Sequence, residues 1–159
     1  MYKIDKIDNQ IVDLLMIDGR MPASEIARKI GKLSERVVRY RLDRMVSEGA
    51  IRICAIPDPK ALGFSVTADV FIEVEAGMIQ DVADKLVAFE FISYVACSIG
   101  ENDISVQVVA RDSVEVYRFA ADVIGRIPGV RKTTTSIVPI ILKDVYEWKI
   151  PSSVWQNAG

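Results

Sequence analysis

The chain has 159 residues, 20 Lys and Arg against 22 Asp and Glu, and a hydrophobic half, which is typical of a globular protein. No apolar run reaches the roughly 18 residues that cross a bilayer, and the charged N-terminus is unlike a secretory signal, so we expect a cytoplasmic protein. Because histidine is absent, as are P-loop, GxGxxG and HExxH motifs, the sequence predicts no enzyme, no cofactor and no metal site.

The small net charge hides a basic stretch near the N-terminus. Residues 1–60 contain 12 Lys and Arg against 9 Asp and Glu, whereas residues 61–159 contain 8 against 13. Seven bases and only two acids fall within residues 28–44. A local positive excess on an acidic chain indicates a polyanionic partner for this stretch or, alternatively, a solvated helix face.

Three short helices are predicted within residues 1–50. They cover residues 6–17, then 22–30 with Pro22 in the first turn, and then a helix that starts after the N-cap Ser34 and ends near residue 48. Residues 31–33 form a tight turn between the second and third helices, which is typical of a helix-turn-helix. The predicted core residues are Ile7, Ile11, Leu14, Leu15, Ile26, Ala27, Ile30, Val38, Leu42, Met45 and Val46.

The faces of the third helix that point away from this core carry long hydrogen-bond donors. Such donors reach base edges and phosphates when a helix enters the major groove, and a nearby lysine adds salt-sensitive attraction. A stable three-helix bundle with a charged surface is the alternative. The predicted DNA contacts are Lys32, Ser34, Glu35, Arg36, Arg39, Tyr40, Arg41 and Arg44.

After the third helix, a strand is predicted over residues 51–56 and a linker over residues 57–63. The rest alternates: strand 66–74, helix 79–89, strand 91–99, hairpin turn 100–103, strand 104–110, helix 112–126 and strand 130–142. This β-α-β-β-α-β order is the ferredoxin-like arrangement. The sequence therefore predicts an α+β protein with a winged-type helix-turn-helix domain at 1–50, a hinge strand and linker at 51–63, a βαββαβ domain at 64–145 and a tail at 146–159.

Three smaller expectations follow. Two helices on one sheet face leave the other face bare, so we expect an obligate homo-oligomer formed by face-to-face packing. Cys54 and Cys97 have no metal or CxxC spacing and are predicted to be buried thiols. The tail residues Trp148 and Trp155 are predicted to make packing or oligomer contacts rather than a binding site.

Short motifs follow one another along almost the whole chain. They are Ile4-Asp5-Lys6-Ile7-Asp8 with Ile11 and Leu14-Leu15, Asp18-Gly19-Arg20, Glu25-Ile26-Ala27, Leu33-Ser34, Val38 with Arg41, Leu42 and Met45, Gly49-Ala50-Ile51, Gly100-x-x-Asp103, and Thr133 with Thr135. In this order and spacing they resemble the Lrp/AsnC (feast/famine) regulators of bacteria and archaea. The turn at Gly31-Lys32-Leu33-Ser34 is one residue longer than the usual family turn.

The resemblance implies that strand 51–56 pairs with its copy in a partner chain, that the α+β domains dimerise, and that dimers assemble into octamers. It also implies that an amino acid binds in a cleft between dimers. Such a zwitterion needs an anion for its ammonium group, which Asp103 can supply, and donors for its carboxylate, which the hydroxyls of residues 133–136 can supply. Glutamine is one candidate among polar amino acids. The alternative is that these residues bind no ligand, because Gly, Asn and Asp are favoured in any hairpin turn and Thr in any strand. Carried over by position, the effector contacts are Gly100, Glu101, Asn102, Asp103, Thr133, Thr134, Thr135 and Ser136.

The sequence thus predicts a sequence-specific DNA-binding transcription regulator whose assembly or DNA binding responds to an amino acid. Two alternatives remain. One is an architectural protein that bends DNA without an effector. The other is a metabolic enzyme or regulatory subunit built on the α+β domain, which would have no use for the basic helix.

Overall fold

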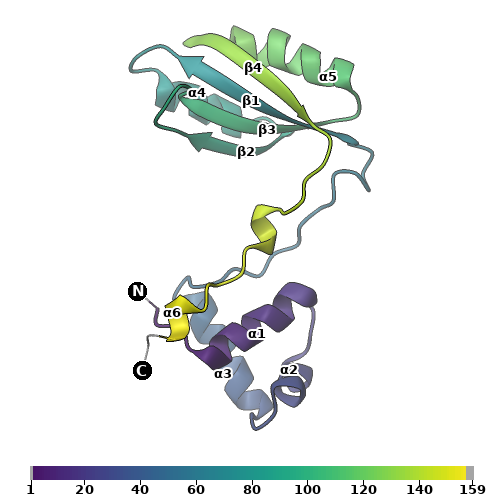
Figure 1. The fold of residues 1–159 in the computed structure, drawn as a ribbon, viewed down its shortest axis with the longest axis vertical. Coiled ribbons are helices and arrows are strands. Elements are labelled where there is room, and N and C mark those ends of the chain that lie inside the picture. The colour runs from purple at the N-terminus through teal and green to yellow at the C-terminus, as the bar shows by residue number, and fades with distance from the viewer. Residues whose placement is uncertain (1, 157–159) are drawn as a thin grey trace. The chain divides into compact units, whose positions relative to one another are not determined.

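The computed structural model describes residues 2–156, so that residue 1 of the predicted DNA-binding domain and residues 157–159 of the predicted tail lie outside the described residues. The chain divides into two compact units (Figure 1). The first comprises the described residues of Met1–Ile56 and Lys143–Gly159, and the second is Pro57–Leu142. Among the described residues, no helix has the length and apolar character needed to span a bilayer.

The first unit contains the three predicted helices, α1 (Lys6–Ile17), α2 (Ala23–Ile30) and α3 (Glu35–Ser47). Their ends follow from local chemistry. The Asp5 carboxylate caps α1 by accepting the Asp8 N–H, and the Ser34 hydroxyl caps α3 by accepting the Val37 N–H at 3.3 Å. Pro22 precedes α2 as its N-cap. The predicted helices are therefore confirmed within one residue at each end.

The core of this unit lies where the three helices meet. Ile11, Ile26, Val38 and Met45 are fully buried there, with Leu42 packed against them. Val46 differs from the prediction, because its side chain is 44% exposed. It follows Met45 by about 100° around the helix and so lies at the edge of the apolar stripe.

The predicted strand at residues 51–56 is not formed in the single chain. The described residues of the first unit contain no β-strand, so the winged-type element predicted for it is not present either. Ile53 and Ile56 are about half exposed. A strand needs a hydrogen-bonding neighbour, and this chain supplies none to the segment.

The C-terminal segment returns to the first unit. A short 3₁₀ helix, Val145–Glu147, is followed by α6 (Ser153–Gln156), which lies against α1 (Figure 1). Trp155 on α6 is half-buried, whereas Trp148 is mostly exposed.

The second unit has the predicted βαββαβ order. Its strands are β1 (Val66–Val74), β2 (Ile92–Cys97), β3 (Ile104–Ala110) and β4 (Val130–Val138), and they form one antiparallel sheet in the order β2-β3-β1-β4. The last strand ends at Val138 rather than at the predicted residue 142. Val138 pairs with Thr67, the second residue of β1, and the next residue, Pro139, has no N–H to donate to the ladder, so the strand ends there.

Two helical segments cover one face of this sheet (Figure 1). The first is α4 (Ile79–Val87). The second begins as α5 (Ser113–Arg118), passes through a π-helical turn at Phe119–Val123 and ends as a 3₁₀ turn at Ile124–Arg126. The structure is thus helical over almost the whole of the predicted helix 112–126, but it changes from α-helix to π-helix to 3₁₀ helix along the way.

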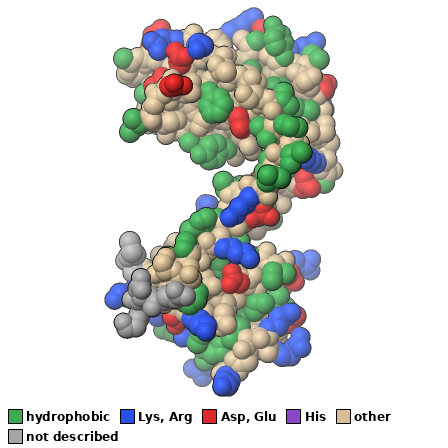
Figure 2. Space-filling view, in the orientation of Figure 1, with side chains coloured by type: hydrophobic (Ala, Val, Ile, Leu, Met, Phe, Trp, Pro, Cys, Tyr) green, Lys and Arg blue, Asp and Glu red, His purple; other side chains and the backbone are tan. Residues whose placement is uncertain are grey.

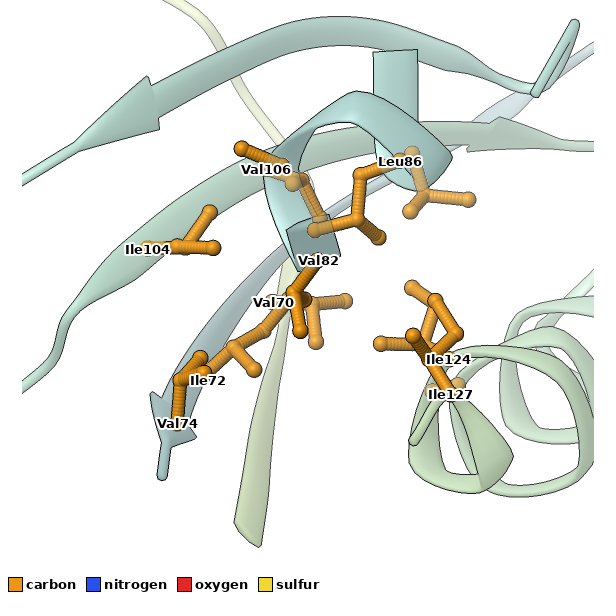
Figure 3. Packing of buried hydrophobic residues seen from close by; sticks show 12 residues of the cluster. Val70, Ile72, Val74, Val82, Leu86, Ile104, Val106, Ile124 and Ile127 are labelled. Carbon is orange, nitrogen blue, oxygen red and sulfur yellow. The ribbon is translucent and has the colours of Figure 1, made fainter. Parts of the chain in front are cut away.

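Alternate strand residues point toward these helices and form the core. Val70 and Ile72 of β1 pack with Val106 of β3 against Val82 and Leu86 of α4 (Figure 3). The residues between them, such as Asp69, Phe71 and Gln107, lie on the opposite, uncovered face and are partly exposed. That face is mixed in character, because the Gln107 amide donates to the Asp69 carboxylate at 3.3 Å.

Both cysteines are exposed, so the prediction of buried thiols was wrong. Cys54 lies in the segment 51–56, which has no strand partner in this chain. Cys97 is the last residue of the edge strand β2. The two residues lie in different units and form no disulfide.

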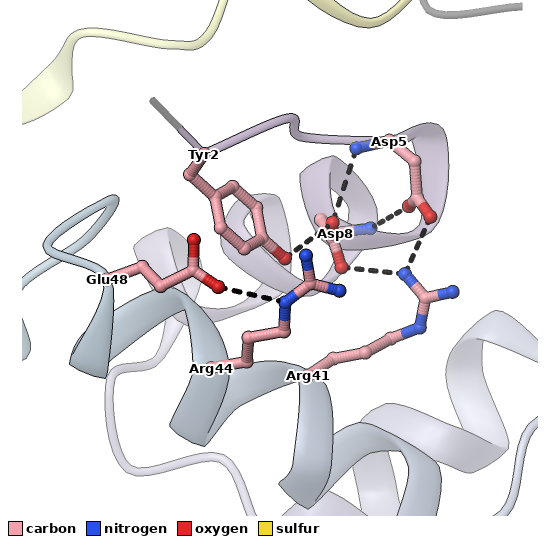
Figure 4. A network of polar contacts seen from close by, with 6 residues as sticks. All are labelled: Tyr2, Asp5, Asp8, Arg41, Arg44 and Glu48. Atoms are coloured by element: carbon pink, nitrogen blue, oxygen red, sulfur yellow. Dashed lines mark hydrogen bonds and ion pairs between the residues drawn. The ribbon is translucent and has the colours of Figure 1, made fainter.

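A cluster of charged side chains joins α3 to the start of α1 (Figure 4). One guanidinium nitrogen of Arg41 donates to Asp5 and to Asp8, at 2.7 Å in each case. The Tyr2 hydroxyl donates to the second oxygen of Asp8 at 2.9 Å, and the Asp5 N–H donates to the same oxygen at 3.2 Å. Because the Asp8 side chain is only 3% exposed, these donors replace the water it has lost.

The pKa values in this cluster reflect its electrostatics. Burial, together with the neighbouring Asp8 carboxylate, raises the pKa of Tyr2 to about 12. Burial opposes the charged form of Asp5, but the Asp8 N–H and the Arg41 guanidinium outweigh it, so the pKa of Asp5 lies below 3.8. The hydrogen bond from Arg41 to Asp5 is the main reason why the pKa of Arg41 is raised. At neutral pH, Asp5 and Arg41 are therefore charged and the Tyr2 hydroxyl keeps its proton.

We expect Arg41→Met to destabilise the first unit by about 2 kcal/mol, because it leaves the buried Asp8 carboxylate without its cation. Both tryptophans belong to the first unit, so urea unfolding followed by tryptophan fluorescence measures this loss. Arg28→Met removes an exposed arginine from α2 and should change stability by less than about 0.5 kcal/mol.

The difference in stability between wild type and Arg41→Met should depend on pH. A carboxyl whose pKa is lower in the folded state stabilises the fold above its unfolded pKa and loses that effect as the pH falls through the folded value. The difference between wild type and Arg41→Met should therefore narrow below about pH 4. An unchanged difference at pH 3 would show that the charge of Asp5 contributes nothing to it.

Candidate functional site

The outer face of α3 presents a line of polar side chains. Arg36, Tyr40 and Ser47 lie at positions i, i+4 and i+11, opposite the buried residues Val38 and Met45. Tyr40 is 64% exposed. Asp43 lies on the same face. Asp43 and Ser47 were not among the predicted contacts, although the helical spacing that identifies Arg36 and Tyr40 also identifies them.

Two further arginines flank this line, each held by an acid one turn away on the same helix. Arg39 donates from its Nε to Glu35 at 2.9 Å, and Arg44 donates from its Nε to Glu48 at 3.1 Å. The Arg44 guanidinium also lies over the Tyr2 ring, 5.1 Å from its centre. Both pairs are well exposed, so a phosphate can displace the acid at little cost.

Arg41 and Ser34, two of the predicted DNA contacts, also have structural roles within the first unit. Arg41 is tied to Asp5 and Asp8 and only a quarter exposed, so its guanidinium already has partners within the unit. Ser34 uses its hydroxyl oxygen to cap α3. Each therefore helps to position the outer face of α3, while the Ser34 O–H and the other N–H groups of the Arg41 guanidinium have no hydrogen-bond partner among the described residues of the unit.

The turn before α3 has an unusual backbone. Gly31 and Lys32 both have positive φ, 73° and 58°. Such a conformation is costly for a residue with a Cβ. The long turn thus places an exposed lysine in a strained position directly before the helix.

The predicted effector residues of the hairpin lie at one end of the sheet. The Asp103 carboxylate accepts the Val74 N–H at 2.7 Å, and the Asp103 N–H donates to the Ile72 carbonyl at 3.0 Å. Asp103 therefore anchors the hairpin to the end of β1. A side chain at Gly100 would meet no atom within 4 Å, so no close approach requires glycine there in the single chain. Glu101 is exposed and Asn102 partly buried.

The four hydroxyl residues of β4 do not point the same way. Thr133 and Thr135 pair with Ile72 and Val70 and share the helix-covered side, whereas Thr134 and Ser136 point to the opposite side. In the sheet order, β1 lies between β4 and β3, which follows the hairpin. Thr133 and Ile104 both pair with Ile72, so within one chain the two predicted segments lie at the same end of the sheet with β1 between them. Among the described residues there is also no cluster of acids and cysteines suited to a metal ion.

Comparison with known families gives two matches that together cover most of the chain. Residues 4–46 match the AsnC-type helix-turn-helix domain, and residues 67–147 match the Lrp/AsnC ligand binding domain.

Individual relatives agree with these matches. An HTH-type transcriptional regulator FL11 from Pyrococcus abyssi is 39% identical over 92% of this chain and 97% of its own length. Another FL11, from Pyrococcus furiosus, is 36% identical over 91% of this chain and 95% of its own. The solved structure of AsnC from E. coli superimposes with a TM-score of 0.82, at 25% identity over 91% of this chain and 99% of that one. These relatives are transcriptional regulators rather than enzymes, and the chain belongs to the Lrp/AsnC family of DNA-binding transcription regulators.

Proposed function

We propose that this regulator reads DNA with the outer face of α3 and that an amino acid bound at the hairpin end of the second unit controls its assembly or its DNA binding. The observation that carries the proposal is the outer face of α3, where exposed donors stand opposite a buried apolar stripe. This is the geometry that a recognition helix needs to sit in the major groove.

The residues of this surface divide into two roles. Arg36 and Tyr40 point directly away from the core and contact base edges. Arg39, Arg44 and Lys32 flank them and contact phosphates, with Arg39 also able to turn from Glu35 to a guanine. Seen from one side, Lys and Arg side chains lie scattered over the surface of the first unit (Figure 2).

The effector site requires more than one chain. Gly100, Glu101, Asn102 and Asp103 would come from one chain. A neighbouring chain would supply hydroxyls from the run Thr133, Thr134, Thr135 and Ser136, using the pair on whichever side of its sheet faces the ligand. Asp103 can face an ammonium group with the oxygen that does not bind the Val74 N–H. A fold neighbour from Neisseria meningitidis was solved as a complex with L-Met, so methionine joins glutamine among the first probes.

A homo-oligomer, with dimers assembling to an octamer, is part of the proposal. The exposed Ile53 and Ile56, the unpaired segment around them, and the uncovered sheet face all leave apolar surface that a second copy would bury. Such a regulator would act in the cytoplasm, where a prokaryotic cell holds its DNA.

An architectural protein that binds DNA without an effector is the second candidate. It is favoured by the structural role of Asp103, because that carboxylate has a reason to be present without any ligand.

We expect Arg36→Ala and Arg39→Ala each to weaken binding to DNA from upstream of the protein's own gene by about 1–3 kcal/mol if each reads a base. Arg126→Ala, in the second unit, is the matched control and should leave the affinity unchanged. Gel shifts on this DNA and on a shuffled sequence measure the effect. If the affinities for the upstream DNA and for the shuffled sequence fall equally, the arginine contacts phosphate and does not read a base.

Lys32→Asn should lower the slope of log affinity against log salt by about one unit, since one phosphate contact is lost. Asparagine tolerates positive φ better than lysine, so the melting temperature should stay the same or rise. A salt slope equal to that of wild type would show that Lys32 does not touch DNA.

A thermal-shift screen against the twenty amino acids should identify at least one that raises the melting temperature of the wild type. Asp103→Asn keeps an acceptor for the Val74 N–H but removes the charge, and it should abolish that response. A response retained in full by Asp103→Asn would contradict the role of Asp103, and no response to any amino acid would favour the architectural function.

A further inference from the structure

The second unit contains a cavity of about 440 Å³ that the proposed effector site does not use. It lies where β3 ends and α5 begins, at the edge of the sheet formed by β2. Its volume falls in the range of small-molecule sites. Among the residues that line it are Phe91, Val108, Phe119, Val123, Arg111 and Arg118.

The apolar part of the cavity belongs to an aromatic cluster. Four of the five phenylalanines in the chain gather here. The centre of the Phe119 ring lies 5.4 Å from that of Phe89 and 5.9 Å from that of Phe91, and both pairs meet edge-on. The ring centres of Phe91 and Phe64 are 6.1 Å apart. These contacts hold Phe91 and Phe119 in place, so the cavity presents two fixed rings to a ligand.

Charged side chains of both signs line the rim. Its three carboxylates have partners: Asp112 caps α5, Glu115 accepts the Arg111 N–H, and Asp122 pairs with Arg126. Arg111 stacks on the Phe64 ring, and neither Arg111 nor Arg118 forms a salt bridge within residues 2–156. The two guanidiniums are therefore the charged groups of the rim that are left without a partner side chain of opposite charge, and they can donate to an anionic group.

The backbone beside the cavity is irregular. The π-helical turn Phe119–Val123 supplies Phe119, Asp122 and Val123 to the lining. Single π-helical turns inside helices cost stability and occur frequently at functional sites. Here the turn widens the helix at the point where it borders the cavity.

The cavity is separate from the proposed effector site. Ala110 borders the cavity, whereas the hairpin precedes Ile104 at the other end of β3, about 20 Å away along the strand. Val108 and Phe119 belong to the helix-covered side of the sheet, so packing of the uncovered face against a second copy would leave the cavity open.

We propose that this cavity is a second ligand site, which takes a small molecule with an apolar, preferably aromatic, body and one carboxylate. The body lies against Phe91 and Phe119, and the carboxylate meets Arg118 and Arg111. The two guanidiniums provide charge-assisted hydrogen bonds at the rim, and the rings exclude water from the apolar part.

The test is a titration of the full-length protein with phenylacetate, followed by backbone amide and phenylalanine ring NMR shifts. We expect saturable binding with the largest shifts at Phe91, Phe119 and Arg118. The neutral isostere 2-phenylethanol should bind at least tenfold more weakly, because it lacks the charged group. Arg118→Gln should weaken phenylacetate binding by a similar factor.

Two further variants keep the test decisive. Lys85→Gln removes one exposed charge from α4 and should leave the phenylacetate affinity unchanged. Val114→Phe fills the cavity from its exposed rim and should abolish binding while the protein stays folded. The proposal is overturned if phenylacetate does not bind, if its shifts centre on residues 100–103, or if Arg118→Gln binds it as well as wild type does.

Discussion

The placement of the proposed DNA-reading surface depends on one buried carboxylate. Asp8 has lost its contact with water, and its charge is acceptable only because Tyr2, the Asp5 N–H and Arg41 donate to it. Arg41 lies on α3 and Asp8 on α1, so the requirement to pair this charge fixes the rotation of α3 about its axis. That rotation in turn decides that Arg36 and Tyr40 point outward.

In the second unit, the directions of the side chains are determined by the alternation of residues along each strand rather than by the pairing of a buried charge. Strict two-residue periodicity in β1 and β3 sends Val70, Ile72 and Val106 toward the helices and leaves Asp69 and Gln107 on the open face. The same alternation splits the hydroxyls of β4 between the two sides of the sheet. A run of four similar residues in a strand therefore gives at most two contacts to any one ligand.

Local signals predicted most of the fold. Caps such as Ser34, apolar spacing in the helices, and alternation in β1 and β3 act over a few residues, and the observed bounds of these elements match the predicted ones closely. The errors arose where a distant partner decides the outcome. Residues 51–56 lack a neighbouring strand in this chain, and Arg41 pairs with acids 33 and 36 positions away. The cavity beside Phe119 also depends on a π-helical turn, for which the sequence carries no periodic signal.

Three features of the single chain are incomplete in the same way, because each lacks a contact with further protein surface. The segment 51–56 has unpaired backbone groups, the open sheet face has Phe71 partly exposed, and the two candidate effector segments stand on either side of β1. Each needs surface that this chain does not provide to itself, and a symmetric contact between identical copies supplies the same surface twice. If an effector bridges two copies, its binding energy adds directly to the association of those copies. The affinity for the effector and the degree of assembly must then rise together, because a ligand shifts an equilibrium only by its differential affinity for the two states.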